Sequence, residues 1–588
     1  NKTRLRMPPI KLAIVTLLLL LPSLVVTSPT EKATKKQPNI LILLVDDLGF
    51  GDIGANGNTT IRTPNVDRIA KEGVRLSHHL TAAPVCTPSR SALLTGKYPI
   101  RMGMVPSIQM QVFPFTASQA GLPTNETTFA KVAQRSGYRT GLIGKWHLGA
   151  HCSNSKDFCH HPNNHGFDYF YGCLLTLLKD FSGLGESILH SRFPHYYRNI
   201  SLTLLATLAS LGVGYKIGIL PRKLCIFLAL LGVLVTGFLF CLPGYLVRTV
   251  NSQLHRQTEL VEQPIRFEKL TQRLVWEGEE FLDKAVDEGK PFLLFMSFLQ
   301  VHSPLYNSVP GYRGRSAHGW YGDNIEEMDW SVGQILDALD KRGLSDDTIV
   351  YFSSDNGGHI EETTHTGERA GGHNGIYRGS KCQGAVDGGI RVPGLLRWPG
   401  VIPAGSQSNA LTSQMDIFPT LLEAMGQPVP SGIDGRSITK LLRQPQSTKS
   451  PHDFLFQYCG TLLHAVRWNS PEGVLKLRHY SPNWLPGTEG CRYICGCMEG
   501  LGSVRHSVPL LYDLSTDERE TAIVPADSER YRRLVPQILE AERRHQASLS
   551  SVPSQFTFAK LMWRPWLQDC CNFPLCNCRD TKYDSRPA

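Results

Sequence analysis

Short apolar runs alternate with amphipathic stretches along most of the chain. Residues 39–45, 291–299 and 348–354 are rich in apolar side chains and carry no charge. Uncharged runs of this kind are typical of strands buried on both faces, whereas the intervening residues 66–73 and 127–137 follow the helical period. The alternation predicts an α/β fold in which helices cover both faces of a mixed, largely parallel sheet.

The pattern changes towards both ends of the chain. After about residue 440 there is more Pro, Cys and Trp and weaker periodicity, which predicts a smaller C-terminal α+β subdomain with a short antiparallel sheet and a helix near residues 528–546. At the other end, basic residues precede an apolar run over residues 12–26. That order is typical of a secretory signal peptide, with the mature start near residues 28–36.

Two longer apolar runs, residues 202–220 and 224–247, flank a basic turn at residues 221–223. Each run approaches the roughly 20 residues that cross a bilayer as a helix, so we predict a transmembrane helical hairpin over residues 201–248. The alternative is a helical pair buried inside the globule. Basic residues flank both ends of the hairpin, so the charge rule alone leaves its topology open.

Composition narrows the class of protein. Hydrophobic residues make up 41% of the chain and charged residues 19%, which is near the globular average. The net charge of +10 comes from dispersed Lys and Arg without a basic run or zinc-finger spacing, so no nucleic-acid partner is expected. The 15 cysteines suit the oxidising secretory pathway. Candidate glycosylation sites in Asn-x-Ser/Thr sequons are Asn58, Asn125 and Asn199.

Polar side chains follow two of the predicted strands. Asp46 and Asp47 end the first, and Asp355 and Asn356 end another. Ligands of doubly wound sheets bind beyond the carboxyl ends of the strands, so these clusters can converge. Carboxylate and amide oxygens favour Ca²⁺ or Mg²⁺ over Zn²⁺. The alternative is that the Asp pair only caps the next turn.

Two long motifs indicate the chemistry. The first is Cys86-Thr-Pro-Ser-Arg90, which continues through Ser91-Ala-Leu-Leu-Thr-Gly, and the second covers residues 137–149. Together they resemble the sulfatase family, whose Cys-x-Pro-Ser-Arg signature is read by the formylglycine-generating enzyme, which oxidises the cysteine to formylglycine. A buried or disulfide-bonded Cys86 is the alternative. The resemblance covers nearly the whole chain, and it is strongest to the steroid and aryl sulfatases that carry a membrane hairpin.

The resemblance implies hydrolysis of a sulfate ester by a hydrated aldehyde. One hydroxyl of the diol attacks sulfur, and the other later expels sulfate by regenerating the aldehyde. The implied ligands of one Ca²⁺ are Asp46, Asp47, Asp355, Asn356 and the modified Cys86. The implied catalytic residues, besides Cys86, are Arg90, Lys145, His147, His302 and Lys381.

Each of these residues has an expected role. Arg90 anchors the modified residue and Lys145 binds sulfate oxygens. His147 lies two residues after Lys145, so in an extended segment both side chains point to one face, where His147 orients or deprotonates the diol. His302 binds sulfate or assists the leaving oxygen, and Lys381 donates to that oxygen. A structural His302 and a solvated Lys381 are the alternatives.

The resemblance also implies a disulfide framework, which spacing alone does not prove. The implied pairs are Cys152–Cys159, Cys459–Cys497, Cys491–Cys495, Cys570–Cys576 and Cys571–Cys578. Three features depart from the subgroup pattern: the amide Asn356 where a Gln is usual, residues 383–389 beside Lys381, and three cysteines without an assigned partner. Those cysteines are Cys173, Cys241 and Cys382.

We therefore expect a membrane-bound sulfate-ester hydrolase of the endoplasmic reticulum with a lumenal catalytic domain. Its substrate is a small sulfate ester, expected to be a steroid sulfate such as a steryl sulfate. The alternatives are a non-steroid aryl sulfate, a phosphatase or phosphodiesterase of the same broad superfamily, and a non-catalytic scaffold. The expected parts are a signal region 1–35, a catalytic domain 36–200 and 249–440, the hairpin 201–248 in contact with the lipid bilayer, and a C-terminal subdomain 441–588.

Overall fold

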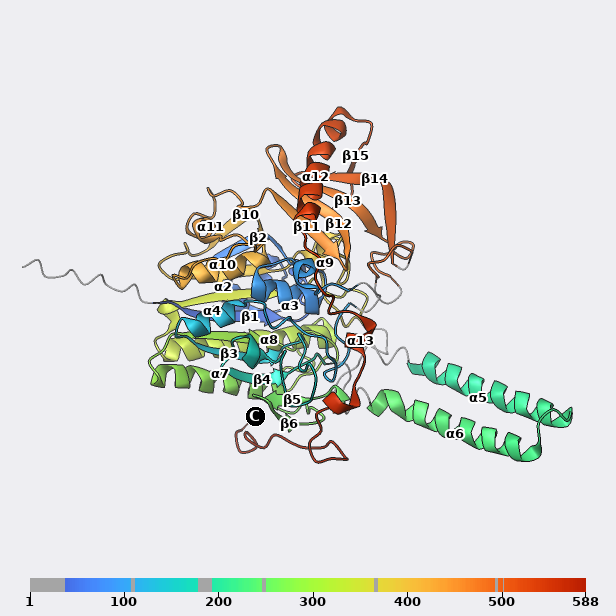
Figure 1. Ribbon diagram of the computed structural model, residues 1–588. Helices are drawn as coiled ribbons and strands as arrows, with labels where there is room; N and C mark the ends of the chain where they lie inside the picture. Colours follow the sequence, from blue (N-terminus) through green and yellow to red (C-terminus); the bar gives the residue numbers. More distant parts are fainter. Residues whose placement is uncertain are drawn as a thin grey trace, which may run out of the picture. The chain divides into compact units, whose positions relative to one another are not determined.

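A ten-stranded mixed sheet forms the centre of the fold in the computed structural model (Figure 1). The structure describes residues 37–106, 111–177, 193–245, 250–363, 368–491, 495–500 and 502–587. The expected signal peptide at residues 1–35 lies outside them. The strand order is β10-β2-β9-β8-β1-β7-β3-β4-β5-β6.

Most neighbouring strands of this sheet run parallel, as the apolar runs predicted. β1 (Asn39–Val45) pairs in parallel with β7 (Phe292–Ser297) on one side and β8 (Thr348–Ser354) on the other. All three strands are buried along their whole length. The remaining strands are β2 (Val74–Leu80), β3 (Arg139–Lys145), β4 (Tyr169–Cys173), β5 (Leu254–Arg256), β6 (Glu259–Glu262), β9 (Gly394–Arg397) and β10 (Ser406–Ser413). β9 is antiparallel to β2 and β8, and β5 is antiparallel to β4 and β6.

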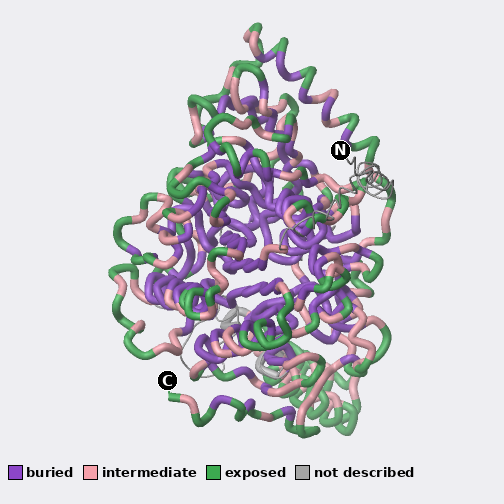
Figure 2. Tube along the Cα trace, turned by 90° about the vertical axis from the view of Figure 1, so that its left-hand side faces the viewer, coloured by how far each residue is buried: buried purple, intermediate pink, exposed green. Residues whose placement is uncertain are grey.

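Helices cover both faces of the sheet because side chains alternate along each strand. Leu41 and Leu43 of β1 pack with α2, α7 and α8, whereas Ile40 and Ile42 pack with α3, α4 and α10. Figure 2 shows how the buried residues gather within this layered body. The bounds are α2 (Pro64–Glu72), α3 (Cys86–Thr95), α4 (Phe129–Arg135), α7 (Leu270–Asp287), α8 (Gly319–Lys341), α9 (Asp387–Ile390), α10 (Ile417–Ala424) and α11 (Thr439–Arg443).

A second, five-stranded antiparallel sheet follows, as expected for the C-terminal part. Its bounds are β11 (Phe454–Cys459), β12 (Leu462–Ser470), β13 (Gly473–Pro482), β14 (Ser503–Asp513) and β15 (Ile523–Val524). α12 (Glu529–Ala547) packs on it through Leu534 and Ile538, and the side chain of Ser528 caps it by accepting from the Tyr531 amide. The helix expected near residues 528–546 is therefore confirmed.

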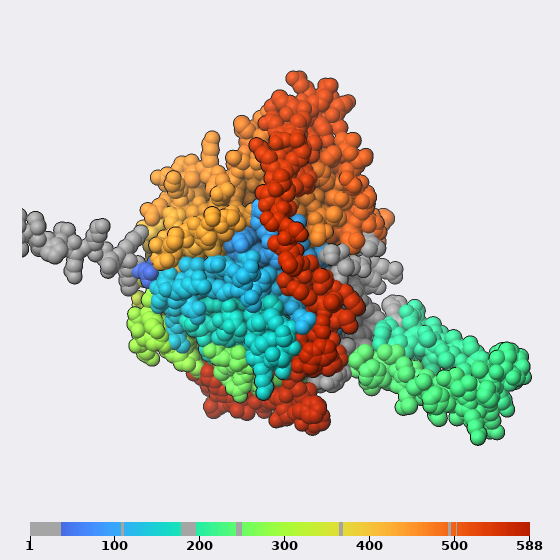
Figure 3. Space-filling view, in the orientation of Figure 1, coloured from blue at the N-terminus to red at the C-terminus, as the bar shows by residue number. Residues whose placement is uncertain are grey.

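The last forty or so residues leave this second sheet and return to the first. In Figure 3 the C-terminal segment, in red, runs down across the N-terminal half of the chain, in blue and cyan. Backbone hydrogen bonds join Gln555 to Gly103 and Cys578 to Gln263, so α13 (Phe558–Leu561) and the tail pack beside the main sheet. The prediction of a C-terminal subdomain did not anticipate this return, because its contacts lie hundreds of residues away in sequence.

The two long apolar runs form helices α5 (Phe193–Lys216) and α6 (Arg222–Tyr245). The Tyr196 hydroxyl donates to the Leu239 carbonyl at 3.0 Å, so the two helices lie side by side. Leu205 is 62% exposed and Leu234 71% exposed, which contradicts the alternative of a pair buried in the globule. Among the described residues only Arg222–Leu242, with a mean hydropathy of 2.7, is long and apolar enough to cross a membrane. α5 begins at Phe193, ahead of the predicted start at residue 201.

The structure contains the five expected disulfides: Cys152–Cys159, Cys459–Cys497, Cys491–Cys495, Cys570–Cys576 and Cys571–Cys578. Cys86, Cys173 and Cys382 are free and buried, and Cys225 and Cys241 are free in α6. Of the three sequons, Asn125 and Asn199 are exposed, the latter in α5, whereas the Asn58 amide nitrogen donates to the Gly51 carbonyl. Their glycosylation stays a prediction.

Acid is expected to destabilise this fold through its buried histidines. Burial lowers the pKa of His161 and of His165 to about 3, from an ordinary value of 6.5. Both rings must fold in the neutral form, so their stabilising contribution is complete above pH 6.5. It is lost as the pH falls towards 3, because only the unfolded chain then takes up the protons. The slope is about 1.4 kcal/mol per pH unit for each ring.

The measurement is the thermal midpoint of unfolding between pH 7 and pH 5. His165→Phe, which keeps an aromatic ring beside Trp146, is expected to flatten this pH dependence. His318 is exposed and supplies the control: His318→Phe should leave the slope close to that of the parent protein. An unchanged slope in His165→Phe would contradict the assignment.

Candidate active site

The predicted site residues meet at the carboxyl edge of the main sheet. Lys145 is the last residue of β3 and Ser297 the last of β7. Asp46 directly follows β1, and Asp355 directly follows β8. These four strands are neighbours in the sheet, so their ends lie together.

Four acidic or thiol side chains form a compact buried group. One ligand atom from each of Asp46, Asp47, Cys86 and Asp355 lies within 4.8 Å of the others. The amide nitrogen of Asn356 donates to Asp47 Oδ1 at 2.8 Å, while its buried Oδ1 atom has no hydrogen-bond partner. An unpartnered oxygen beside three carboxylates is the arrangement that a hard divalent cation satisfies, so these residues fit a bound metal.

The Asp pair does more than cap a turn. Asp46 Oδ2 accepts from Lys145 Nζ at 2.5 Å, and Asp47 Oδ2 accepts from Lys381 Nζ at 2.6 Å. The turn after β1 is closed instead by Asp52, which accepts from the Gly49 amide at 2.7 Å. The capping alternative is therefore wrong for Asp46 and Asp47.

Burial alone would raise the pKa of both carboxyl groups, but the nearby ammonium groups outweigh it. The pKa of Asp46 is lowered, chiefly by Lys145, and that of Asp47 falls to about 2, chiefly through Lys381. Lys381 is only 7% exposed, so it is not a solvated loop lysine. Burial alone would lower its pKa, but Asp47 outweighs burial and holds that pKa well above the ordinary value. Asp46, Asp47 and Lys381 are thus all charged at neutral pH.

Cys86 is the first residue of α3 and carries no disulfide. Its Sγ lies 3.5 Å from Asp46 Oδ1. Arg90 is one helical turn further on, so it shares a face with Cys86. Its Nε donates to Asp355 Oδ2 at 2.8 Å, which fixes the Cys86 face of the helix against the carboxylate cluster. Burial raises the pKa of the Cys86 thiol well above its ordinary value, so an unmodified thiol would stay protonated here.

Two histidines complete the group. The His147 ring is buried, and its Nε2 atom lies 3.1 Å from the Phe113 carbonyl, so Nε2 carries the proton and donates it. Nδ1 is then an unpartnered acceptor, and burial together with Lys145 lowers the pKa of this ring well below its ordinary value. His302 follows β7, and its Nε2 lies 3.8 Å from Asp47 Oδ2.

The expected reason for the convergence of Lys145 and His147 is wrong. β3 ends at Lys145, and His147 has a φ of 60°, so the segment is not extended there. The left-handed residue turns the chain after the strand, and both side chains are still only 1% exposed. Convergence therefore depends on a turn that periodicity does not reveal.

Ser297 belongs to the site although the motifs did not indicate it. Its hydroxyl donates to the Lys145 carbonyl at 2.6 Å and accepts from Arg90 Nη1 at 2.7 Å. It therefore ties the ends of β3 and β7 to α3. A polar residue closing an otherwise apolar strand was the available signal.

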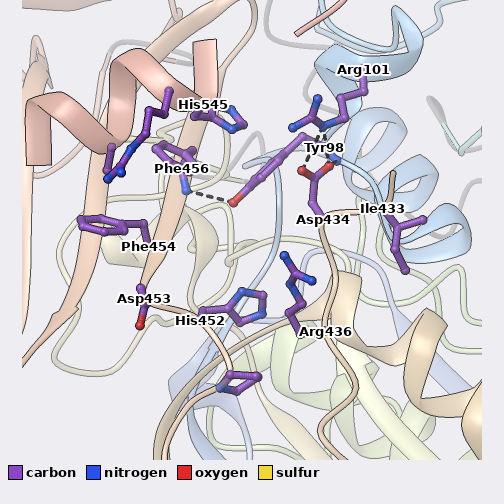
Figure 4. A pocket seen from close by; sticks show the side chains of 13 residues that line it. Tyr98, Arg101, Ile433, Asp434, Arg436, His452, Asp453, Phe454, Phe456 and His545 are labelled. Carbon is purple, nitrogen blue, oxygen red and sulfur yellow. Dashed lines mark hydrogen bonds and ion pairs between the residues drawn. The ribbon is translucent and has the colours of Figure 1, made fainter. Parts of the chain in front are cut away.

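A separate pocket of about 450 Å³ is lined by β11, α12 and the segments around residues 98–101 and 433–436 (Figure 4). Figure 4 shows Arg101 turned onto Asp434, with Nε 2.9 Å from both carboxylate oxygens. His452 likewise lies 2.7 Å from Asp416. The pocket shares no residue with the carboxylate cluster, so it is not the catalytic centre.

Residues 38–427, which hold every residue of the cluster, match the family described as Sulfatase. The chain belongs to the sulfatase family. Residues 450–578 match a second description, the C-terminal region of aryl-sulfatase. Together these matches cover both sheets and most of the returning tail.

Similar proteins carry the same family name over almost the whole chain. Human (Homo sapiens) steryl-sulfatase is 45% identical over 573 residues, which are 95% of this chain and 96% of that protein. Human arylsulfatase D is 42% identical over 96% of each chain, and human arylsulfatase H is 44% identical over 92% of this chain and 97% of its own. The chain is therefore a sulfuric ester hydrolase.

Among solved structures, the PsFucS1 sulfatase from Pseudoalteromonas sp. superimposes with a TM-score of 0.67 at 26% identity. The superposition covers 88% of this chain and 92% of that one. The α/β architecture with a separate C-terminal sheet is thus a sulfatase architecture.

Proposed function

We propose that this sulfatase hydrolyses steroid sulfates at the lumenal face of the endoplasmic reticulum membrane, with formylglycine at position 86 and one Ca²⁺ at the carboxylate cluster. The observation that carries the proposal is the setting of Cys86. It is free, buried and placed on the carboxylate cluster by α3, in the motif that the modifying enzyme reads. A thiol with a raised pKa gains no catalytic use there until it is converted.

The chain supplies residues for both proposed cofactors, the Ca²⁺ and the formylglycine. Asp46, Asp47, Asp355 and the free Asn356 oxygen would hold the Ca²⁺, which when bound supplies positive charge next to the nucleophile and the sulfate. Formylglycine supplies a carbon that carries two hydroxyl groups when hydrated, so sulfate can later leave by cleavage of the carbon–oxygen bond rather than by attack of water on sulfur.

The side chains around the cluster have different roles in binding sulfate and moving protons. Lys145 and Lys381 are buried cations that can hold the oxygens of a sulfate group. His147 presents the unprotonated Nδ1, which can accept the proton of the attacking hydroxyl. Lys381 and His302 lie near Asp47, and we assign to Lys381 the proton that the leaving alkoxide needs.

The steroid substrate rests on two observations. The chain is similar to steryl-sulfatases of three organisms at 42–45% identity. In addition, α6 presents exposed apolar side chains along a length that can cross a bilayer. A membrane anchor would hold the enzyme at the bilayer into which a lipid-soluble sulfate ester partitions.

A non-steroid aryl sulfate is the second candidate, because arylsulfatases D and H are similar to this chain at 42% and 44% identity. Turnover of a steroid sulfate and of 4-nitrophenyl sulfate by one purified sample distinguishes the two. The proposal predicts turnover of both. Turnover of 4-nitrophenyl sulfate alone would favour the aryl substrate, and turnover of neither would support a non-catalytic scaffold.

The membrane anchor gives a separate prediction. The full-length chain is expected in the carbonate-resistant membrane fraction of cells, and Leu230→Lys with Leu234→Lys should move most of it to the soluble or aggregated fraction. Each buried lysine costs about 2.5–3.5 kcal/mol at the centre of a membrane helix. Both leucines are exposed in the structure, at 61% and 71%, so the folded body should tolerate the change. Gln537→Lys on the exposed face of α12 is the matched control.

Extraction of the unchanged parent chain by carbonate would contradict the anchor. Such a result would leave the catalytic proposal standing, because no residue of the cluster lies in α5 or α6.

A further inference from the structure

A buried network of charges joins the C-terminal sheet to residues 378–382, which carry Lys381 and are called the lysine loop here. Asp387 begins α9 and is 1% exposed. Its Oδ1 accepts from Lys476 Nζ of β13 at 2.9 Å and from Arg467 of β12 in a short ion pair. Lys476 also donates to Glu520 Oε1 at 2.9 Å. Both basic side chains are fully buried, so no solvent weakens these contacts. Burial lowers the pKa of Lys476 well below its ordinary value, whereas Asp387 opposes that shift.

The network holds the backbone of α9 as well as its side chain. The Asp387 amide donates to Glu520 Oε1 at 3.1 Å, and Arg391, at the end of α9, reaches Asp387 Oδ2 at 3.5 Å. Arg478 of β13 forms a short ion pair with Glu520. Burial alone would raise the pKa of Asp387, but Arg467, Lys476 and Arg391 outweigh it and hold that pKa well below its ordinary value.

α9 in turn contacts both loops that build the active site. The Gly388 amide donates to the Arg378 carbonyl at 2.8 Å, at the start of the loop that carries Lys381. The Gly389 carbonyl accepts from the Gly357 amide at 3.0 Å, one residue after Asn356. A shift of α9 would therefore displace both Lys381 and the loop that carries Asn356.

These contacts leave α9 and the two loops little room to move. A Cβ atom on Gly388 would lie 2.2 Å from the Gly379 carbonyl oxygen, and one on Gly357 would lie 1.8 Å from the Gly388 carbonyl oxygen. The lysine loop is also fixed from its other side, since the Cys382 amide donates to the Pro84 carbonyl at 2.7 Å, two residues before Cys86. Backbones packed this closely move together.

We propose that Asp387 and Lys476 are positioning residues for Lys381: the C-terminal sheet, through this ion pair, sets where the lysine ammonium stands against the leaving oxygen. The inference rests on the proposed role of Lys381 as proton donor. It gives the second sheet a part in catalysis, although none of its residues belongs to the carboxylate cluster.

The test is Lys476→Met, assayed with phenyl sulfate and 4-nitrophenyl sulfate. This change leaves no carboxylate without a cation, because Asp387 keeps Arg467 and Arg391, and Glu520 keeps Arg478. Phenoxide is a poor leaving group that needs the lysine proton, whereas 4-nitrophenoxide needs it little. We expect kcat to fall roughly tenfold or more for phenyl sulfate and less than about threefold for 4-nitrophenyl sulfate, with each KM within about twofold of its parent value.

A second variant separates positioning from general damage. In a Lys381→Met background, adding Lys476→Met should change kcat for phenyl sulfate less than about twofold, since the group being positioned is gone. Glu472→Gln removes exposed ion pairs between the β12–β13 turn and α12 and serves as the control, with both rates expected near the parent values. Asp387→Asn should reproduce the leaving-group pattern of Lys476→Met.

Equal losses with the two esters, or independent losses in the double variant, would overturn the positioning role while leaving the sulfatase function intact. Absence of turnover of both esters by the parent protein would instead overturn the proposed mechanism, and the positioning role with it.

Discussion

Cys86→Ser is expected to lower steady-state turnover of 4-nitrophenyl sulfate by at least roughly 10³-fold. Serine offers a single hydroxyl, so once that oxygen has taken the sulfate there is no second hydroxyl on the same carbon to expel it. The variant should therefore release at most about one 4-nitrophenolate per molecule and then stop. The measurement is a burst assay followed by the intact mass of the protein, which should show one added sulfate.

Cys173→Ser is the matched control for this change. Cys173 is also free and buried, and it ends β4 rather than standing in the Cys86 motif. Its variant should keep formylglycine and most of the parent activity. Sustained turnover by Cys86→Ser at a rate near that of the parent would contradict the diol mechanism.

Asp355→Asn is expected to abolish metal-dependent activity, with a loss of roughly 10³-fold at a Ca²⁺ concentration that saturates the parent. Asp355 contributes to the cluster in two ways: it belongs to the group that fits the metal, and its Oδ2 accepts from Arg90 Nε at 2.8 Å. Substitution leaves the buried guanidinium with less compensation and the metal with a weaker ligand. The thermal midpoint should also stop responding to Ca²⁺.

Calcium titration of the parent supplies the stability arm of this test. A ligand that binds only the folded state at 100 times its Kd adds about 2.7 kcal/mol of stability, so chelation should lower the thermal midpoint of the parent and not that of Asp355→Asn. Asp283→Asn, which loses only a surface ion pair with Arg342, is the control. A parent protein that keeps its midpoint and activity after exhaustive chelation would contradict the metal site.

Local patterns were sufficient for much of the fold. The apolar runs at residues 39–45 and 348–354 coincide with β1 and β8, because strands buried on both faces must be apolar throughout. The convergence of the carboxylates that follow these strands was also predictable, because neighbouring parallel strands end at the same edge of the sheet. Cys86 and Arg90 followed from a motif whose chemistry fixes both residue types.

The remaining features depend on contacts that have no local pattern. The turn after β3 depends on a left-handed backbone conformation at His147, which the neighbouring residues do not indicate. Ser297 is recognisable as a site residue only once β3 and β7 are known to be adjacent. The ion pair between Asp387 and Lys476 spans 89 residues. Charged residues at such positions usually predict an exposed surface, whereas here mutual compensation allows their burial.

The proposed conversion of Cys86 is tested most directly by mass spectrometry of the peptide that spans residue 86, in protein produced with the formylglycine-generating enzyme, together with turnover by the same sample. The account predicts an aldehyde at position 86 and a rate of sulfate-ester hydrolysis that rises in proportion to the converted fraction. Full turnover by protein in which Cys86 remains a thiol, or complete conversion without any turnover, would contradict it.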